Sequence, residues 1–140
     1  MVDKADLLAR FTLFAGLTPD ELARIAKLTE ELEVGAGSVL THEGRFEGFF
    51  YLVVAGTVEI SRGGQAVDTV GAGGFVGEIS LLDAGPRTAT ATTLTPCELL
   101  RLNNRQFDVL LDANPSIRDT LRATMEARLA RMDEEAAVRG

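Results

Sequence analysis

The chain has 140 residues, of which 46% are hydrophobic and 25% are charged, and its formal net charge is −7. This length suits one globular domain with a buried core, so we expect residues 1–140 to form a single domain. The acidic balance argues against direct binding to nucleic acid or to an anionic membrane, because both depend on clustered lysines and arginines. The longest apolar run, 49–55, is far shorter than the roughly 20 residues of a membrane-spanning helix.

The first region, about 3–31, is predicted to be helical. Thr18 is a good N-cap, Pro19 suits the first helical position, and Glu21 completes a capping box. The residues that follow recur at the spacing of one apolar helix face. That face consists of Leu22, Ile25, Ala26 and Leu28, and a shorter preceding helix is indicated by Leu7, Leu8, Phe11 and Phe14.

From about Val34 the hydrophobic period changes to two, and glycines recur every several residues. Gly63 and Gly64 separate two strand-like segments, which is typical of a tight hairpin. Many short strands with glycine between them favour a sandwich or a small barrel. The predicted fold class is therefore α+β: an antiparallel, jelly-roll-like β-roll of about eight short strands over about 33–102, flanked by helices.

Helical patterns return over about 104–135. Asn103 or Asn104 is a candidate N-cap, and Asn114 with Pro115 opens a last, longer helix. Its tail after Asp133 is polar and is expected to fray. The apolar stripe on this helix is formed by Ile117, Leu121, Met125, Leu129 and Met132. Spacing alone leaves two partners open for this stripe, the roll or a second copy of the helix, so a homodimer through the last helix is one expectation.

The most specific segment is "GFVGEISLLDAGPRTATA", residues 74–91, which holds an isolated acid, Glu78, and an isolated base, Arg87. It is neither a Walker A loop, which needs Gly-Lys-Ser/Thr, nor a dinucleotide fingerprint, which needs glycine where Val76 stands. The bland alternative is a surface ion pair in a loop, which typically stabilises by under about 1 kcal/mol.

The chemistry of this segment favours an anion. Free N–H groups near Gly77 and Ile79, at the start of one helical turn, are donors suited to a phosphate. The guanidinium of Arg87 offers two further donors in one plane, and Thr88 and Ala89 add a hydroxyl and an N–H. Glu78 suits a sugar hydroxyl instead, because two anions repel. An acid for a sugar and a base for a phosphate together indicate a nucleotide.

Residues 74–91 resemble the phosphate-binding cassette of the cyclic nucleotide-binding domain family, which runs Phe-Gly-Glu, an apolar turn, a gap and Pro-Arg-Thr/Ser/Ala-Ala. "LFAGLTPDELARIA", "HEG", "GFFYLVVAGTVEI" and "LLRLNNRQFDVLLDANP" resemble other parts of the family in the same order. The resemblance implies that Glu78 binds the ribose 2′-hydroxyl and that Arg87 binds the exocyclic phosphate. The assisting groups would be Gly77, Ile79, Ser80, Thr88 and Ala89, and the apolar walls for the base would be Val70, Phe75 and Val76.

Two departures from the family pattern concern packing. Val76 stands where an aromatic residue is common, and Gly74 where an acid is common. The resemblance also implies that Arg128, on the last helix, covers the base, and that this helix acts as a lid. Thr88 is compatible with either cAMP or cGMP, and cAMP is the expected ligand on frequency alone.

The resulting expectation is a non-enzymatic cyclic nucleotide receptor with no metal and no cofactor. It would pass its signal through the last helix to an effector protein or domain, as a stand-alone regulator or as part of a longer protein. Two alternatives are a ligand-free interaction module of the same fold and a cupin-like metalloenzyme, although His42 is the only histidine. A single cysteine, Cys97, and no recognisable leader predict a cytoplasmic location.

Overall fold

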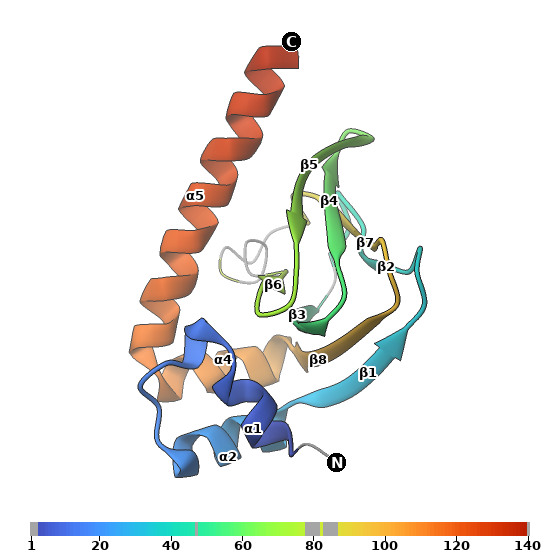
Figure 1. Cartoon of the computed structure of the whole chain (residues 1–140). Helices are drawn as coiled ribbons and strands as arrows, with labels where there is room; N and C mark the ends of the chain where they lie inside the picture. Colours follow the sequence, from blue (N-terminus) through green and yellow to red (C-terminus); the bar gives the residue numbers. More distant parts are fainter. Residues whose placement is uncertain (1–2, 47, 78–81, 83–86, 140) are drawn as a thin grey trace.

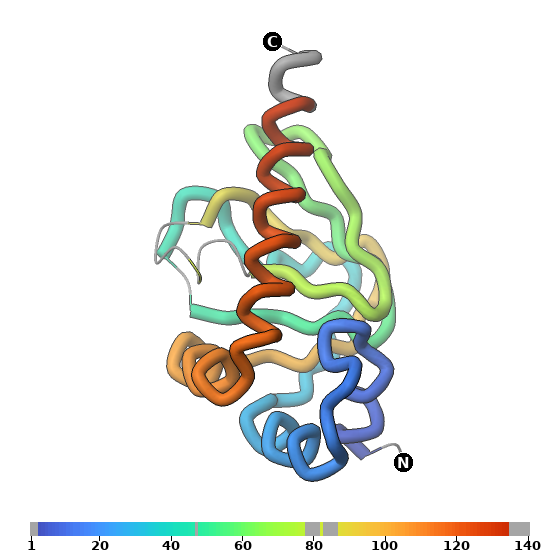
Figure 2. The backbone as a smooth tube through the Cα atoms, turned by 90° about the vertical axis from the view of Figure 1, so that its left-hand side faces the viewer, coloured from blue at the N-terminus to red at the C-terminus, as the bar shows by residue number. Residues whose placement is uncertain are grey.

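The computed structural model describes residues 3–46, 48–77, 82 and 87–139. Helices gather at one end of a β-roll, and the last helix runs along the side of the roll (Figures 1 and 2). Three of the predicted ligand residues, Glu78, Ile79 and Ser80, lie outside the described residues.

The N-terminal region holds α1 (Lys4–Ala9), a 3-10 turn η1 (Thr12–Phe14) and α2 (Pro19–Leu28). The predicted capping box of α2 is confirmed: Glu21 N–H donates to Thr18 Oγ1 at 3.2 Å, and Thr18 N–H donates to Glu21 Oε1 at 3.0 Å. The helical region ends earlier than expected, because strand β1 already begins at Glu30.

In the part of the chain that the structure describes, eight strands form two antiparallel sheets of four strands each, in the orders β1-β8-β3-β6 and β2-β7-β4-β5. The predicted fold class is confirmed. The bounds are β1 (Glu30–Val34), β2 (Val39–Thr41), β3 (Phe49–Ala55), β4 (Val58–Arg62), β5 (Gln65–Val70), β6 (Phe75–Val76), β7 (Thr90–Thr93) and β8 (Cys97–Asn103). Gly63 and Gly64 connect β4 to β5 at positive φ, as the hairpin prediction requires.

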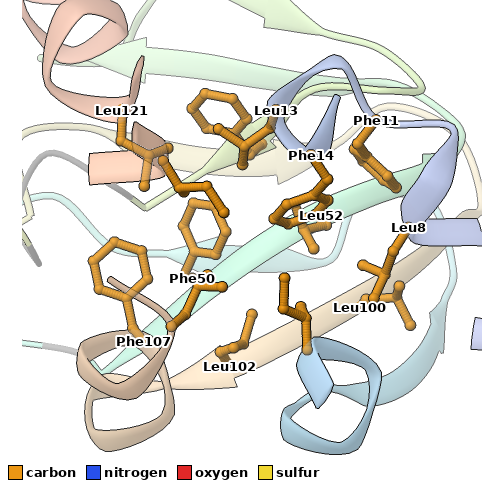
Figure 3. Close-up of a cluster of buried hydrophobic side chains, with 14 of the residues drawn as sticks. Leu8, Phe11, Leu13, Phe14, Phe50, Leu52, Leu100, Leu102, Phe107 and Leu121 are labelled. Atoms are coloured by element: carbon orange, nitrogen blue, oxygen red, sulfur yellow. The ribbon is translucent and has the colours of Figure 1, made fainter. Parts of the chain in front are cut away.

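Strand β3 is buried on both faces, which explains why its sequence is apolar without alternation. Phe50 and Leu52 point into a core shared with the helices, together with Leu100 and Leu102 of β8 (Figure 3). Because successive side chains on a strand point to opposite faces, the intervening Tyr51 and Val53 enter a second core inside the roll. The β1-β8-β3-β6 sheet therefore separates a helix-facing core from the interior of the roll.

The C-terminal region consists of α4 (Asn104–Ala113) and α5 (Pro115–Arg139). Asn103 is the N-cap of α4 and forms a capping box with Gln106. Helix α5 continues to Arg139, beyond the predicted end near 135. Among the described residues, no helix is both long enough and apolar enough to cross a membrane.

The apolar stripe of α5 packs against the protein's own fold. Ile117 and Leu121 belong to the helix-facing core. Further along, the buried Met125 and Met132 pack in a small cluster with Val67 of β5, among others. The first part of the stripe is therefore covered by the helix-facing core and the second part by the β5 side of the roll, and the homodimer stays a prediction.

Candidate functional site

A cavity lies between the inner face of the β2-β7-β4-β5 sheet, the segment around Arg87, and the C-terminal half of α5. It is enclosed on three sides by elements far apart in the sequence. The described residues that line it are Thr41, Ile60, Val67, Asp68, Val76, Gly77, Arg87, Thr88, Ala89, Ala91, Arg128, Arg131 and Met132.

One row of paired residues forms the floor of this cavity. Asp68 of β5 is in register with Ile60 of β4, Ile60 with Ala91 of β7, and Ala91 with Thr41 of β2. Paired residues on neighbouring strands point to the same face, so all four line the cavity together. Apart from Asp68, this row is buried.

Arg87 lies just before β7 and is only 4% exposed. Its guanidinium donates from Nη1 to the carbonyl oxygen of Gly77 at 2.8 Å, and from Nη2 to that of Phe49. Its backbone is also fixed, because its N–H donates to Arg45 O and its carbonyl accepts from Gly44 N–H, each at 2.8 Å. A buried cation is held at one wall of the cavity in a defined orientation.

Gly77 makes this orientation sterically possible. Its φ is +100°, a conformation that residues with a side chain rarely adopt. A Cβ atom at this position would lie 2.7 Å from Phe49 O and 2.8 Å from Arg87 Nη1. The glycine of the predicted motif is thus required by the approach of the arginine.

The structure brings together most of the predicted ligand residues that it describes. Gly77, Arg87, Thr88 and Ala89 all line the cavity, as does Arg128 from α5. Thr41 lies beside them, and its hydroxyl donates to Ala89 O at 3.2 Å. The predicted contacts of Glu78, Ile79 and Ser80 lie outside the described residues and stay predictions.

Of the three predicted apolar walls, only Val76 lines the cavity. Phe75, its neighbour on β6, packs against Phe50 with ring centroids 5.7 Å apart, because successive strand residues face opposite ways. Val70 is buried inside the roll, where its Cγ1 atom occupies the space that a Cβ on Gly74 would need. The apolar lining instead comes from Ile60, Val67, Ala91 and Met132.

Two charged residues of the cavity were not predicted from the sequence. Asp68 Oδ2 and Arg131 Nη2 are 3.0 Å apart, joining β5 to α5. A second ion pair joins β4 to α5: Arg62 and Asp133 are 3.4 Å apart, and neither residue lines the cavity. One signal was available for Asp68: it interrupts the alternate positions of β5 between Ala66 and Val70, which are apolar.

Arg128 lies on the same helix and faces the end of β6. Its guanidinium carbon is 5.0 Å from the centre of the Phe75 ring, a cation–π geometry. Arg128 and Met132 are one helical turn apart, so both project onto the cavity from one face of α5. Among the described residues, no group of three or more His, Cys, Asp or Glu side chains is placed to hold a metal ion.

Residues 31–114 match the cyclic nucleotide-binding domain family, and the chain belongs to that family. The matched range contains both sheets, apart from Glu30 at the start of β1, and Arg87. The resemblance stated from the cassette residues is therefore confirmed.

Similar proteins include channels and transcriptional regulators. The chain is 32% identical over 118 residues to a cyclic nucleotide-gated potassium channel of Rhizobium etli, covering 84% of this chain and 33% of the channel. It is 28% identical over 137 residues to a CRP-like cAMP-activated global transcriptional regulator of Mycobacterium tuberculosis, covering 94% and 61%. The chain thus spans less than two thirds of the length of either relative.

Solved structures with the same architecture include regulators from different systems. The catabolite activator protein of Thermus thermophilus superposes with a TM-score of 0.76 at 31% identity, over 90% of this chain and 62% of that one. A structure titled cAMP bound PfPKA-R gives a TM-score of 0.87 at 24% identity, over 94% and 46%. The second likeness concerns the fold alone.

Proposed function

We propose that this chain is a receptor module, not an enzyme, that binds cAMP in the cavity under α5 and passes the signal on through that helix. cGMP is the alternative ligand. The proposal goes beyond family membership: it names the ligand, its orientation in the cavity and the helix that transmits the signal. It is supported above all by the buried guanidinium of Arg87 in the wall of the cavity.

The fixed orientation of Arg87 supports a phosphate at this wall. An arginine held by two backbone carbonyls has lost its rotamer freedom before any ligand arrives. The burial of its charge also strengthens attraction to an anion, because the local dielectric is low. Thr88 and the Ala89 backbone lie at the same wall and supply further donors.

The remaining parts of the ligand follow from the position of the phosphate. The base would lie over the apolar floor made by Ile60 and Ala91, beneath Met132 of α5. Arg128 would cover its edge. Glu78 would accept a hydrogen bond from the ribose 2′-hydroxyl, as the family motif implies.

Helix α5 is proposed to carry the output because it forms one wall of the same cavity. A ligand shifts its position only if it binds one arrangement of the helix more tightly than another. The effector would be a separate protein or a further domain of a longer one, and we propose that the module acts in the cytoplasm.

The proposal is tested by titrating the purified chain with cAMP and cGMP in a calorimeter. Arg87→Ala should weaken cAMP binding by about 1.5–3 kcal/mol, or about 10- to 150-fold, because a charge-assisted contact is lost. Arg118→Ala is the matched control, since it removes the same charge from an exposed ion pair with Asp112. Equal affinities for wild type and a folded Arg87→Ala variant would contradict the proposal.

A spectrum gives an independent observation. The chain has no tryptophan and one tyrosine, so its own absorbance at 280 nm is weak. Nucleotide that co-purifies would dominate the spectrum near 260 nm. A ligand-free interaction module, the competing hypothesis, would show neither this absorbance nor heat on titration.

A further inference from the structure

Asp68 is the one acidic side chain among the described residues that line the cavity. It stands on the apolar floor, in register with the buried Ile60, and its side chain is only 25% exposed. Removing a carboxylate from water is unfavourable unless hydrogen-bond donors replace the water. The carboxylate of Asp68 is therefore expected to have hydrogen-bond donors around it.

The described residues supply two such donors. Arg131 Nη2 lies 3.0 Å from Oδ2, and Thr69 N–H donates to Oδ1 at 2.9 Å. An ionised carboxylate has about four acceptor positions on its two oxygens. Asp68 is thus held in a fixed orientation and keeps capacity to accept from a ligand.

Asp68 and Arg87 lie toward opposite sides of the cavity. Arg87 precedes β7, and two strand spacings of about 4.8 Å each separate β7 from β5 in the sheet order β7-β4-β5. The cavity therefore has a basic wall at Arg87 and, across the apolar floor, the Asp68 carboxylate with its partner Arg131. A cyclic nucleotide has a matching arrangement, because its phosphate is anionic and its base carries N–H donors at the far edge.

Resting on the proposed function, we propose that Asp68 determines base specificity by accepting a hydrogen bond from the 6-amino group of adenine. Arg131 is a positioning residue, which holds the carboxylate and ties the occupied floor to α5. Guanine presents an acceptor oxygen where adenine presents this donor. The carboxylate repels that oxygen, so cGMP cannot make this contact at position 6, whereas cAMP can.

The test compares two ligands that differ only in the group concerned: cAMP and the 3′,5′-cyclic monophosphate of purine riboside, which lacks the 6-amino group. Asp68→Ala should lower the affinity for cAMP by about 10- to 150-fold, the range for a hydrogen bond to a charged group. The affinity for the purine riboside ligand should fall by less than about threefold. Circular dichroism checks that the variant is folded.

Two controls separate base reading from other effects. Asp133→Ala removes the Arg62 ion pair of α5, which is outside the cavity lining, and should leave the ratio of the two affinities unchanged. Arg87→Ala should weaken both ligands equally, because both carry the same phosphate.

Equal losses for the two ligands in Asp68→Ala would overturn the inference and assign Asp68 a purely structural ion pair. Unchanged cAMP affinity in that variant would overturn it as well. A wild-type chain that binds neither ligand would overturn the proposed function itself, and the assignment of Asp68 with it. The failure of one proposal is therefore distinguishable from the failure of the other.

Discussion

The guanidinium of Arg87 lies against Gly77: its Nη1 donates to the Gly77 carbonyl oxygen at 2.8 Å and lies 2.8 Å from the position that a Cβ on this residue would take. The two residues are ten positions apart, yet each depends on the other. Arg87 is held by the carbonyl oxygen of Gly77, and the approach of Arg87 leaves no room for a side chain on residue 77. The conformation of the wall that is proposed to hold phosphate therefore depends on both.

Gly77→Ala is expected to destabilise the fold and weaken ligand binding together. The φ of +100° alone costs about 1–2 kcal/mol for a residue with a Cβ, and the contacts with Phe49 O and Arg87 Nη1 add to that cost. Gly73→Ala is the matched control, because Gly73 has a φ of +91° with nothing within 4 Å of its Cβ position. Denaturant unfolding of both variants measures the difference; equal losses would show that the close approach has no effect.

Arg87→Lys is expected to keep the charge but lose the geometry. A lysine ammonium cannot donate to two carbonyls and a phosphate from one rigid plane. Its cAMP affinity should fall between those of wild type and Arg87→Ala, by about tenfold. Calorimetry provides the measurement, and full wild-type affinity in Arg87→Lys would show that charge alone is sufficient.

Glu78→Ala is expected to weaken cAMP binding while leaving binding of 2′-deoxy-cAMP nearly unchanged. The reason is that the proposed contact requires the 2′-hydroxyl as donor. The measurement is a pair of titrations with each protein. If the variant loses the same factor for both ligands, the assignment of Glu78 to the sugar is wrong.

Arg128→Ala is expected to lower cAMP affinity modestly, by about two- to fivefold. This is the size of effect expected when one partly exposed cation–π or stacking contact is lost. The guanidinium carbon of Arg128 already lies 5.0 Å from the centre of the Phe75 ring. Arg122→Ala, an exposed arginine on the same helix, is the control. Identical affinities for the two variants would remove Arg128 from the proposed site.

Much of the fold was predictable because its signals are local. The capping box at Thr18 needs only residues three positions apart, and the Gly63-Gly64 turn needs only its own backbone, whereas the choice between Asn103 and Asn104 as the cap of α4 was made by the structure. The family was recognisable for a similar reason, since the order and spacing of the cassette residues resemble one family. The two short elements before α2 and the early start of β1 were less clear, because propensity does not fix where an element begins.

The cavity walls were harder to predict. Phe75 and Val76 have similar apolar character, and only the pairing of β6 with β3 decides which of them faces the cavity. Asp68 and Arg131 meet because α5 lies along the roll, a contact between distant parts of the chain that no local pattern encodes.

The sequence by itself determined the cap at Thr18, the two-residue hairpin, the α+β class and the resemblance to one family, because each depends on neighbours along the chain. Only the tertiary structure decided that the stripe of α5 packs on the helix-facing core and on β5 of the same chain, and that an acid from β5 shares a cavity with Arg87. The physical reason is that periodicity reveals which face of an element is apolar, whereas the partner of that face is chosen by the packing of the whole chain.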